Sequence, residues 1–208
     1  MIGPADAEVF SRCIQVGGVA VFPADTVYGL ACEPDTPEAV ARLYALKGRR
    51  PGKPAAIMFF DRELAFAALP ELEPRTRALL ERLLPGAITA LLPNPARRFP
   101  LACGPGHGDA LGLRVPALGD ELAALSAMRW PVLQSSANRA GGADARRLEE
   151  VPEAIRVEAD LVLDGGELAG TPSTVVDLRS FEREGSWAVV RAGAVPAAAI
   201  EAAAAGLA

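Results

Sequence analysis

The segment 19–60, VAVFPADTVYGLACEPDTPEAVARLYALKGRRPGKPAAIMFF, contains the alternation of elements that decides the fold. Its first five residues, VAVFP, form a short apolar run that is typical of a buried strand. We expect a loop over 24–34. A helix should then begin with Pro37 and end at Gly48, because proline is favoured at the first helical position. The apolar run at 55–60 predicts the next strand. A strand, a helix and a second strand in this order indicate an α/β domain.

The alternation continues along the rest of the chain. We expect further strands at 87–92, 111–115, 131–134, 161–163, 174–178 and 187–191, and helices from 61, at 74–84, at 120–128 and at 196–204. Strands dominate the last third, which favours a mixed sheet over a strictly parallel one. The sequence therefore predicts one α/β domain over 1–208, with an open mixed sheet of parallel and antiparallel strands and helices packed on it.

Composition limits the kinds of partner. A net charge of −5 argues against a global electrostatic grip on nucleic acid, so any anion site must be a local cluster of Lys and Arg. The three cysteines are odd in number and lack CxxC spacing, which indicates reduced thiols and no zinc site. No apolar run approaches the ~20 residues that span a bilayer, and the first ten residues lack a signal-peptide pattern. We expect a cytoplasmic protein with no membrane partner.

The stretch Lys47–Pro54, KGRRPGKP, is the first candidate for chemistry. Its glycines and prolines keep it out of a helix, and Arg and Lys together suit phosphate groups. It does not match the phosphate-binding loop of nucleoside triphosphatases, because three residues separate its glycines and Pro54 follows Lys53. From composition alone, a solvated basic loop and a phosphate site are about equally supported. The single histidine, His107, argues against a histidine-based catalytic triad.

Polar side chains also gather where strands end. Such segments occur at 23–30 (PADTVYGL), 135–138 (SSAN) and 171–177 (TPSTVVD), and Arg114 and Arg191 each end a strand. Loops at strand ends are where open α/β sheets bind ligands. Each segment also has a plainer interpretation: an ordinary turn with Tyr28 in the core, a helix cap, or a solvated arginine.

Taken in order, six segments make the sequence resemble the YrdC-like family, whose founding activity is L-threonylcarbamoyladenylate synthesis. The segments are PADTVYGL (23–30), KGRRPGKP (47–54), GLRVP (112–116), SSAN (135–138), PSTVVD (172–177) and VVRAGAVP (189–196). The resemblance implies a twisted open α/β sheet with a positively lined groove. It is closest to single-domain members, without the additional C-terminal domain of longer ones.

The resemblance implies an enzyme that combines L-threonine, bicarbonate and ATP, the last with Mg²⁺, into threonylcarbamoyl-AMP and pyrophosphate. The product would pass to partner proteins that make the t6A base of tRNA. The implied catalytic residues are Lys47 and Arg49. The implied ATP site is Lys47, Arg49, Lys53, Asn138, Arg146 and Arg191, and the implied L-threonine site is Thr26, Met58, Arg114, Ser136 and Ser173. Met58 stands where many members have His, and Arg146 where some have Ser or Thr. No residue is implied as a metal ligand.

Two other functions stay open at this point. One is a relative that forms a carbamoyl-adenylate but passes it to another acceptor, since the fold also occurs inside carbamoyltransferases. The other is a non-catalytic, RNA-binding or ribosome-associated member. The net charge counts against strong, salt-sensitive RNA binding, although not against a local groove.

Overall fold

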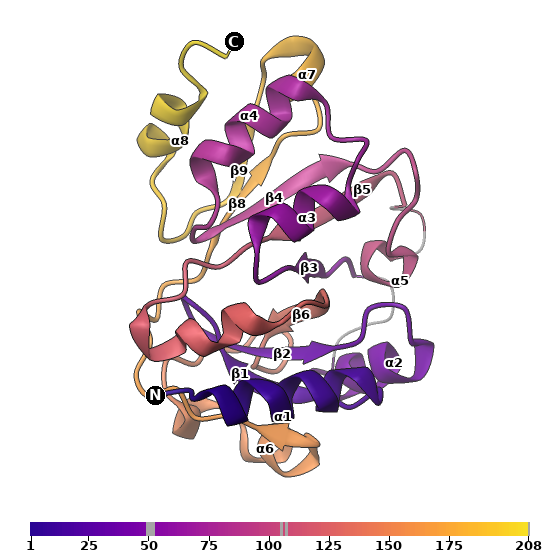
Figure 1. Ribbon diagram of the computed structural model, residues 1–208, viewed down its shortest axis with the longest axis vertical. Coiled ribbons are helices and arrows are strands. Elements are labelled where there is room, and N and C mark those ends of the chain that lie inside the picture. Colours follow the sequence, from indigo (N-terminus) through magenta and orange to yellow (C-terminus); the bar gives the residue numbers. More distant parts are fainter. Residues whose placement is uncertain (49–52, 105, 107, 208) are drawn as a thin grey trace.

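The computed structural model describes residues 1–48, 53–104, 106 and 108–207. Within these residues one sheet has nine strands in the order β7-β1-β2-β6-β3-β5-β4-β8-β9 (Figure 1). The strands are β1 (Ala20–Pro23), β2 (Tyr28–Cys32), β3 (Ala56–Met58), β4 (Ile88–Pro93), β5 (Ala110–Arg114), β6 (Val132–Ser136), β7 (Leu161–Val162), β8 (Thr174–Asp177) and β9 (Ala188–Arg191). The pairs β1–β7, β3–β5 and β4–β8 are parallel and the other five are antiparallel. The predicted mixed sheet is confirmed.

The helices begin and end largely where local sequence signals place them. They are α1 (Pro4–Gln15), α2 (Pro37–Leu46), α3 (Arg62–Ala68), α4 (Pro74–Leu83), α5 (Pro100–Cys103), α6 (Glu153–Glu158), α7 (Phe181–Glu184) and α8 (Ala197–Ala204), with 3-10 helices η1 (Asp120–Ala127) and η2 (Leu148–Glu150). Gly48 follows α2 with a φ of +57°, a conformation that glycine adopts without steric cost. Asp61 caps α3 by accepting a 2.9 Å hydrogen bond from the Leu64 amide.

One expectation about secondary structure is wrong, and several helices are not among the predicted elements. The predicted loop 24–34 contains β2, which pairs with β1 so that Pro23 lies opposite Tyr28. All five residues of β2 are buried, so the strand lacks the polar-apolar alternation of a half-exposed strand. The short helices α5, α6 and α7 have no counterpart among the predicted elements. Helix α1 was not predicted at all, although its buried residues recur on one helical face.

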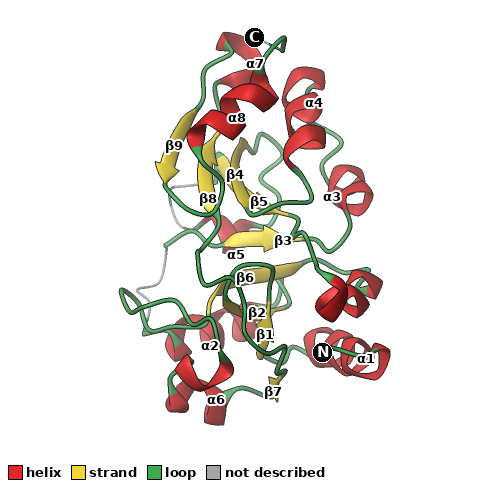
Figure 2. Cartoon of the chain, turned by 90° about the vertical axis from the view of Figure 1, so that its left-hand side faces the viewer, coloured by secondary structure: helices red, strands yellow, loops and turns green. Residues whose placement is uncertain are grey.

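The two faces of the sheet are covered differently. Strand residues alternate between faces, and one face packs under α1 and η1 through an aromatic cluster around Phe10, Phe22 and Phe60. The opposite face carries the larger core under α2, α3, α4 and α8. Figure 2 shows α1 and α2 on opposite sides of the sheet at its β1 end. Among the described residues, the cluster under α1 and η1 includes none from β4, β5, β8 or β9, and a pocket lined in part by these strands lies beyond it.

Tyr28 anchors the β1–β2 hairpin to the loop after β7. Its hydroxyl accepts a 3.0 Å hydrogen bond from the Gly165 amide and lies 2.9 Å from the Gly166 carbonyl oxygen. Burial raises the pKa of Tyr28 to about 12, so the hydroxyl stays protonated at neutral pH. The plainer interpretation of this tyrosine, a core residue, is thus the one that the structure supports. A helix long and apolar enough for a bilayer is not found among the described residues.

Candidate functional site

The pocket has a volume of about 580 Å³, within the range of small-molecule sites. Its floor is low because Ala56 of β3 lies opposite Gly112 of β5, and neither has a bulky side chain. Its described lining includes five cationic side chains, Lys47, Lys53, Arg114, Arg179 and Arg191, and one carboxylate, Asp144. In a chain of net charge −5, this concentration of positive charge favours an anionic ligand.

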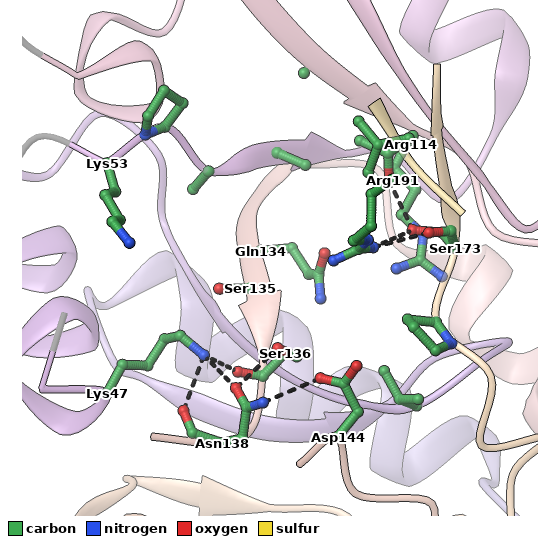
Figure 3. Close-up of a pocket in the computed structure, with 18 of the residues that line it drawn as sticks. Lys47, Lys53, Arg114, Gln134, Ser135, Ser136, Asn138, Asp144, Ser173 and Arg191 are labelled. Carbon is green, nitrogen blue, oxygen red and sulfur yellow. Dashed lines mark hydrogen bonds between the residues drawn. The ribbon is translucent and has the colours of Figure 1, made fainter. Parts of the chain in front are cut away.

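One polar cluster joins the end of α2 to the turn after β6 (Figure 3). The Lys47 ammonium is 3% exposed and donates to the Ser136 carbonyl oxygen, to the Asn138 carbonyl oxygen at 2.9 Å and to Asn138 Oδ1 at 2.8 Å. Ser136 Oγ donates to the same Oδ1 at 2.9 Å. The three N–H groups of Lys47 therefore hold the turn as a buried cross-link, while its charge stays at the pocket wall.

Asn138 extends this cluster to the loop that closes one side of the pocket. Its amide nitrogen donates to the Gly142 carbonyl oxygen at 2.7 Å and to Asp144 Oδ1 at 3.1 Å. The orientation of Asn138 is thus set from both ends of its carboxamide.

A second cluster surrounds Arg114 at the end of β5. Its Nη2 donates to Asp25 and, at 2.7 Å, to Thr26 Oγ1, and both charged side chains are about 95% buried, with exposed fractions of 4% and 5%. Burial lowers the pKa of Arg114 and Asp25 opposes that shift, while Arg191 adds to it. Arg114 Nε is buried without a hydrogen-bond partner among the described residues. Arg114 is also a lining residue of the pocket, so its guanidinium brings positive charge to that wall.

Arg191 and Ser173 meet at the edge of β8 and β9. Arg191 Nη2 donates to the Ser173 carbonyl oxygen at 2.8 Å, and Ser173 Oγ lies 2.8 Å from Thr89 Oγ1 on β4. The two strands are paired, so this polar group is fixed to the sheet. It faces the same pocket as the Lys47 cluster.

Most site residues predicted from sequence come together here. The pocket lining contains Lys47, Lys53, Arg114, Ser136, Asn138, Ser173 and Arg191. Thr26 lies behind Arg114 as its hydrogen-bond partner. Arg49 falls outside the described residues.

Besides Thr26, two predicted residues among those described are not part of the pocket lining. Met58 is fully buried in the aromatic cluster beneath α1, and its side chain is not exposed to any ligand. Arg146 is half-exposed and pairs with Glu167 at 2.8 Å. The geometry does not support either assignment, and we leave both residues out of the site.

Five polar residues of the described lining are absent from the predicted site: Thr89, Gln134, Ser135, Asp144 and Arg179. Gln134 had a usable signal, because it precedes Ser136 by two positions on a strand and so shares its face. Arg179 is held by Asp177 through contacts of 2.6 to 3.1 Å. Thr89, Asp144 and Arg179 reach the pocket through tertiary structure, which local sequence does not specify.

The described residues contain no cluster of three or more His, Cys, Asp or Glu side chains that could hold a metal ion. Mg²⁺ bound with a nucleotide needs no such cluster, because it is held by phosphate oxygens, water and one or two carboxylates. Asp144 is a carboxylate in the pocket lining. The residues present therefore fit a metal that is carried by a nucleotide.

The open mixed sheet, with a pocket lined by cationic side chains on one face, defines the class: an α/β protein whose pocket favours an anionic ligand. Residues 12–193 match the model of the Sua5/YciO/YrdC family, which is described as "Telomere recombination", and the chain belongs to this family.

Relatives of known name support the same placement. The chain is 38% identical over 171 residues to the threonylcarbamoyl-AMP synthase of Chromohalobacter salexigens, covering 81% of this chain and 90% of that protein. Among solved structures, Pyrococcus abyssi Sua5 complexed with L-threonine matches with a TM-score of 0.79 at 26% identity, over 98% of this chain and 58% of that one. E. coli YciO matches with a TM-score of 0.78 at 23% identity, over 96% and 95%, which shows the shared fold.

Proposed function

We propose that this protein is a threonylcarbamoyl-AMP synthase, a nucleotidyltransferase that joins L-threonine, bicarbonate and ATP and releases pyrophosphate. The observation that carries the proposal is that the two polar clusters, one around Arg114 and one around Lys47, open into a single pocket. An amino acid and a nucleotide must meet in one enclosure for this reaction. The homology to synthases at 38% identity supports the same substrates.

The Arg114 side of the pocket suits the amino acid. The threonine carboxylate would pair with the Arg114 guanidinium, which lines the pocket. Thr26 fixes the guanidinium from behind, and Ser173 offers a hydroxyl at the pocket wall. Ser136, on the strand between the two clusters, is the remaining proposed contact to L-threonine.

The Lys47 side of the pocket suits the phosphates. Lys47 and Lys53 bring positive charge, and Arg191 faces the pocket from β9. Because Lys47 holds the turn with its N–H groups, its proposed role combines attraction of the phosphates with positioning of Asn138. Arg49, from the basic stretch, stays a proposed ATP-binding and catalytic residue on the sequence alone.

The chemistry needs positioning and charge more than a strong base. The threonine amine and bicarbonate give a carbamate and water. A carbamate oxygen then forms a bond to the α-phosphorus as the bond from that phosphorus to the bridging oxygen of the β-phosphate breaks, and pyrophosphate leaves. Negative charge spreads over the phosphoryl oxygens in the transition state, which fixed cations such as Lys47 and Arg191 stabilise. Bound with ATP, Mg²⁺ supplies further neutralisation of phosphate charge.

Downstream, the product would be taken up by proteins that transfer the threonylcarbamoyl group to tRNA. Two alternatives give different outcomes in the same assay: an enzyme with another acceptor than threonine, and a non-catalytic RNA-binding member. We propose threonylcarbamoyl-AMP synthesis over both alternatives because the pocket has cationic side chains on each of two walls.

Pyrophosphate release tests the proposal. The protein is incubated with ATP, Mg²⁺, bicarbonate and L-threonine, and each component is omitted in turn. We expect release that requires both L-threonine and bicarbonate. Release that depends on bicarbonate but is supported by another amine would indicate another acceptor. An absence of release, together with RNA retention on a filter at moderate salt, would support the RNA-binding alternative.

A further inference from the structure

Gln134 is a buried polar side chain in the pocket that the reaction as described does not use. It lies on β6, two residues before Ser136 and on the same face of the sheet, and it is 6% exposed. Its carboxamide makes no hydrogen bond within the part of the chain that the structure describes, although the residue lines the pocket. Neither carboxamide atom is among the buried polar atoms that lack a partner, so both are accessible from the pocket although the residue as a whole is nearly buried. A ligand in the pocket can therefore reach a donor and an acceptor held in place by a strand.

The neighbouring strands leave room for this carboxamide. A Cβ added to Gly29 of β2 would lie 2.9 Å from Gln134 Nε2, closer than real side chains approach. On the other side, Gln134 pairs with Ala56 of β3, whose side chain is a single methyl group. Small residues on both sides therefore allow the carboxamide of Gln134 to lie at the pocket floor, where a larger neighbour would displace it.

The position of Gln134 lies between the two polar clusters. Ser136 follows it on its own strand, and Gly112 lies beyond Ala56 on the strand that ends with Arg114. In Figure 3 the carboxamide projects into the space between Ser136 and the pair formed by Arg191 and Ser173. A ligand that spans the pocket must place its central group here.

We propose that Gln134 binds the carbamate of L-threonine, with Oε1 accepting a hydrogen bond from the carbamate N–H and Nε2 donating one to a carbamate oxygen. This inference rests on the proposed function, in which the carbamate links the amino acid to the α-phosphorus. A primary carboxamide carries a donor and an acceptor side by side, and a carbamate presents the matching acceptor and donor. Free L-threonine has the N–H but lacks the adjoining carbonyl oxygen, so the pair of bonds distinguishes the carbamate from its precursor.

Binding measurements test this assignment without relying on turnover. Isothermal titration without ATP compares N-carbamoyl-L-threonine, which has the N–H and the carbonyl oxygen, with L-threonine. Gln134→Met removes both hydrogen bonds at nearly constant shape. Gln15→Met is the matched control, because Gln15 is exposed on α1, away from the pocket. Circular dichroism melting checks that both variants are folded.

We expect wild type to prefer N-carbamoyl-L-threonine, and we expect that preference to fall about tenfold in Gln134→Met and to stay unchanged in Gln15→Met. The bicarbonate concentration for half-maximal pyrophosphate release should rise about tenfold in the first variant, with the ATP requirement unchanged. An unchanged preference in Gln134→Met, in an enzyme that releases pyrophosphate, would overturn the role of Gln134 alone. A preference that depends on Gln134 without any pyrophosphate release would overturn the proposed reaction but support the binding assignment.

Discussion

Replacing Lys47 by methionine should destabilise the protein as well as weaken ATP binding. The ammonium makes three hydrogen bonds to oxygen atoms of Ser136 and Asn138 and is 3% exposed. Hydrogen bonds to a charged group contribute about 1.5–3 kcal/mol each, and leaving their acceptors unpaired is costly. Because the pocket is open, water can replace some of the hydrogen bonds lost by the acceptors. We therefore expect the free energy of unfolding to fall by about 3 kcal/mol. For a chain of 208 residues that corresponds to a melting temperature lower by about 6–12 °C.

The other lysine of the chain provides a matched control. Lys53 lines the same pocket but is exposed, so Lys53→Met removes the same charge without removing a buried cross-link. Urea unfolding should place Lys53→Met within about 0.5 kcal/mol of wild type, while calorimetric titration should show weaker ATP binding in both variants. The reasoning is refuted if Lys47→Met unfolds at the same urea concentration as wild type, or if both variants lose equal stability.

Three further outcomes follow from other parts of the structure. Ala56→Leu should fill the pocket floor and abolish ATP binding measured by calorimetry, while the free energy of unfolding changes by less than about 1 kcal/mol. Normal ATP affinity in this variant would contradict the placement of the site. Asp25→Asn should lower the free energy of unfolding, measured in urea, by about 3–5 kcal/mol because it leaves Arg114 buried and unpaired. Adding Arg114→Met to this variant should recover part of that loss. If the double variant instead loses the sum of the two single-variant losses, the two side chains do not act as a pair. The Arg42 hydrogen bond lowers the pKa of Asp160 from its usual 3.8, so the carboxylate stabilises the fold above that pH and the effect is lost as pH falls through the lowered value. Asp160→Asn should therefore be about 1 kcal/mol less stable at pH 7, a small effect because the pair is partly exposed. The difference from wild type should shrink as the pH falls below 3.8 and through the lowered pKa, and a difference that widens in acid would have the wrong sign.

The sequence predicts the fold best where local chemistry is decisive. Pro37 and Gly48 mark the two ends of α2, and Asp61 marks the start of α3. Strand β2 could not be recognised in this way, because it is buried on both faces and contains Gly29, which weakens any strand pattern. Helix α1 has buried apolar residues at helical spacing, so the sequence does contain a signal that predicts it.

The site residues also divide into those that sequence motifs identify and those that depend on tertiary structure. Six motifs taken together point to residues that the fold brings to one pocket from strands far apart in the chain. The pairing of Asp25 with Arg114 joins residues 89 positions apart and depends on tertiary structure. Met58 shows the limit of a family resemblance: motif position assigns it to the L-threonine site, whereas its side chain packs under α1.

The most direct test of the account is mass spectrometry of the product formed from ¹³C-bicarbonate, L-threonine and ATP. We predict a single adenylate whose mass equals AMP joined to a threonylcarbamoyl group with one ¹³C atom, formed in step with pyrophosphate. Its formation should fail in Ala56→Leu, which fills the pocket floor. An adenylate that contains threonine but no ¹³C, or release of phosphate in place of pyrophosphate, would contradict the proposal that a carbamate attacks the α-phosphorus in this pocket.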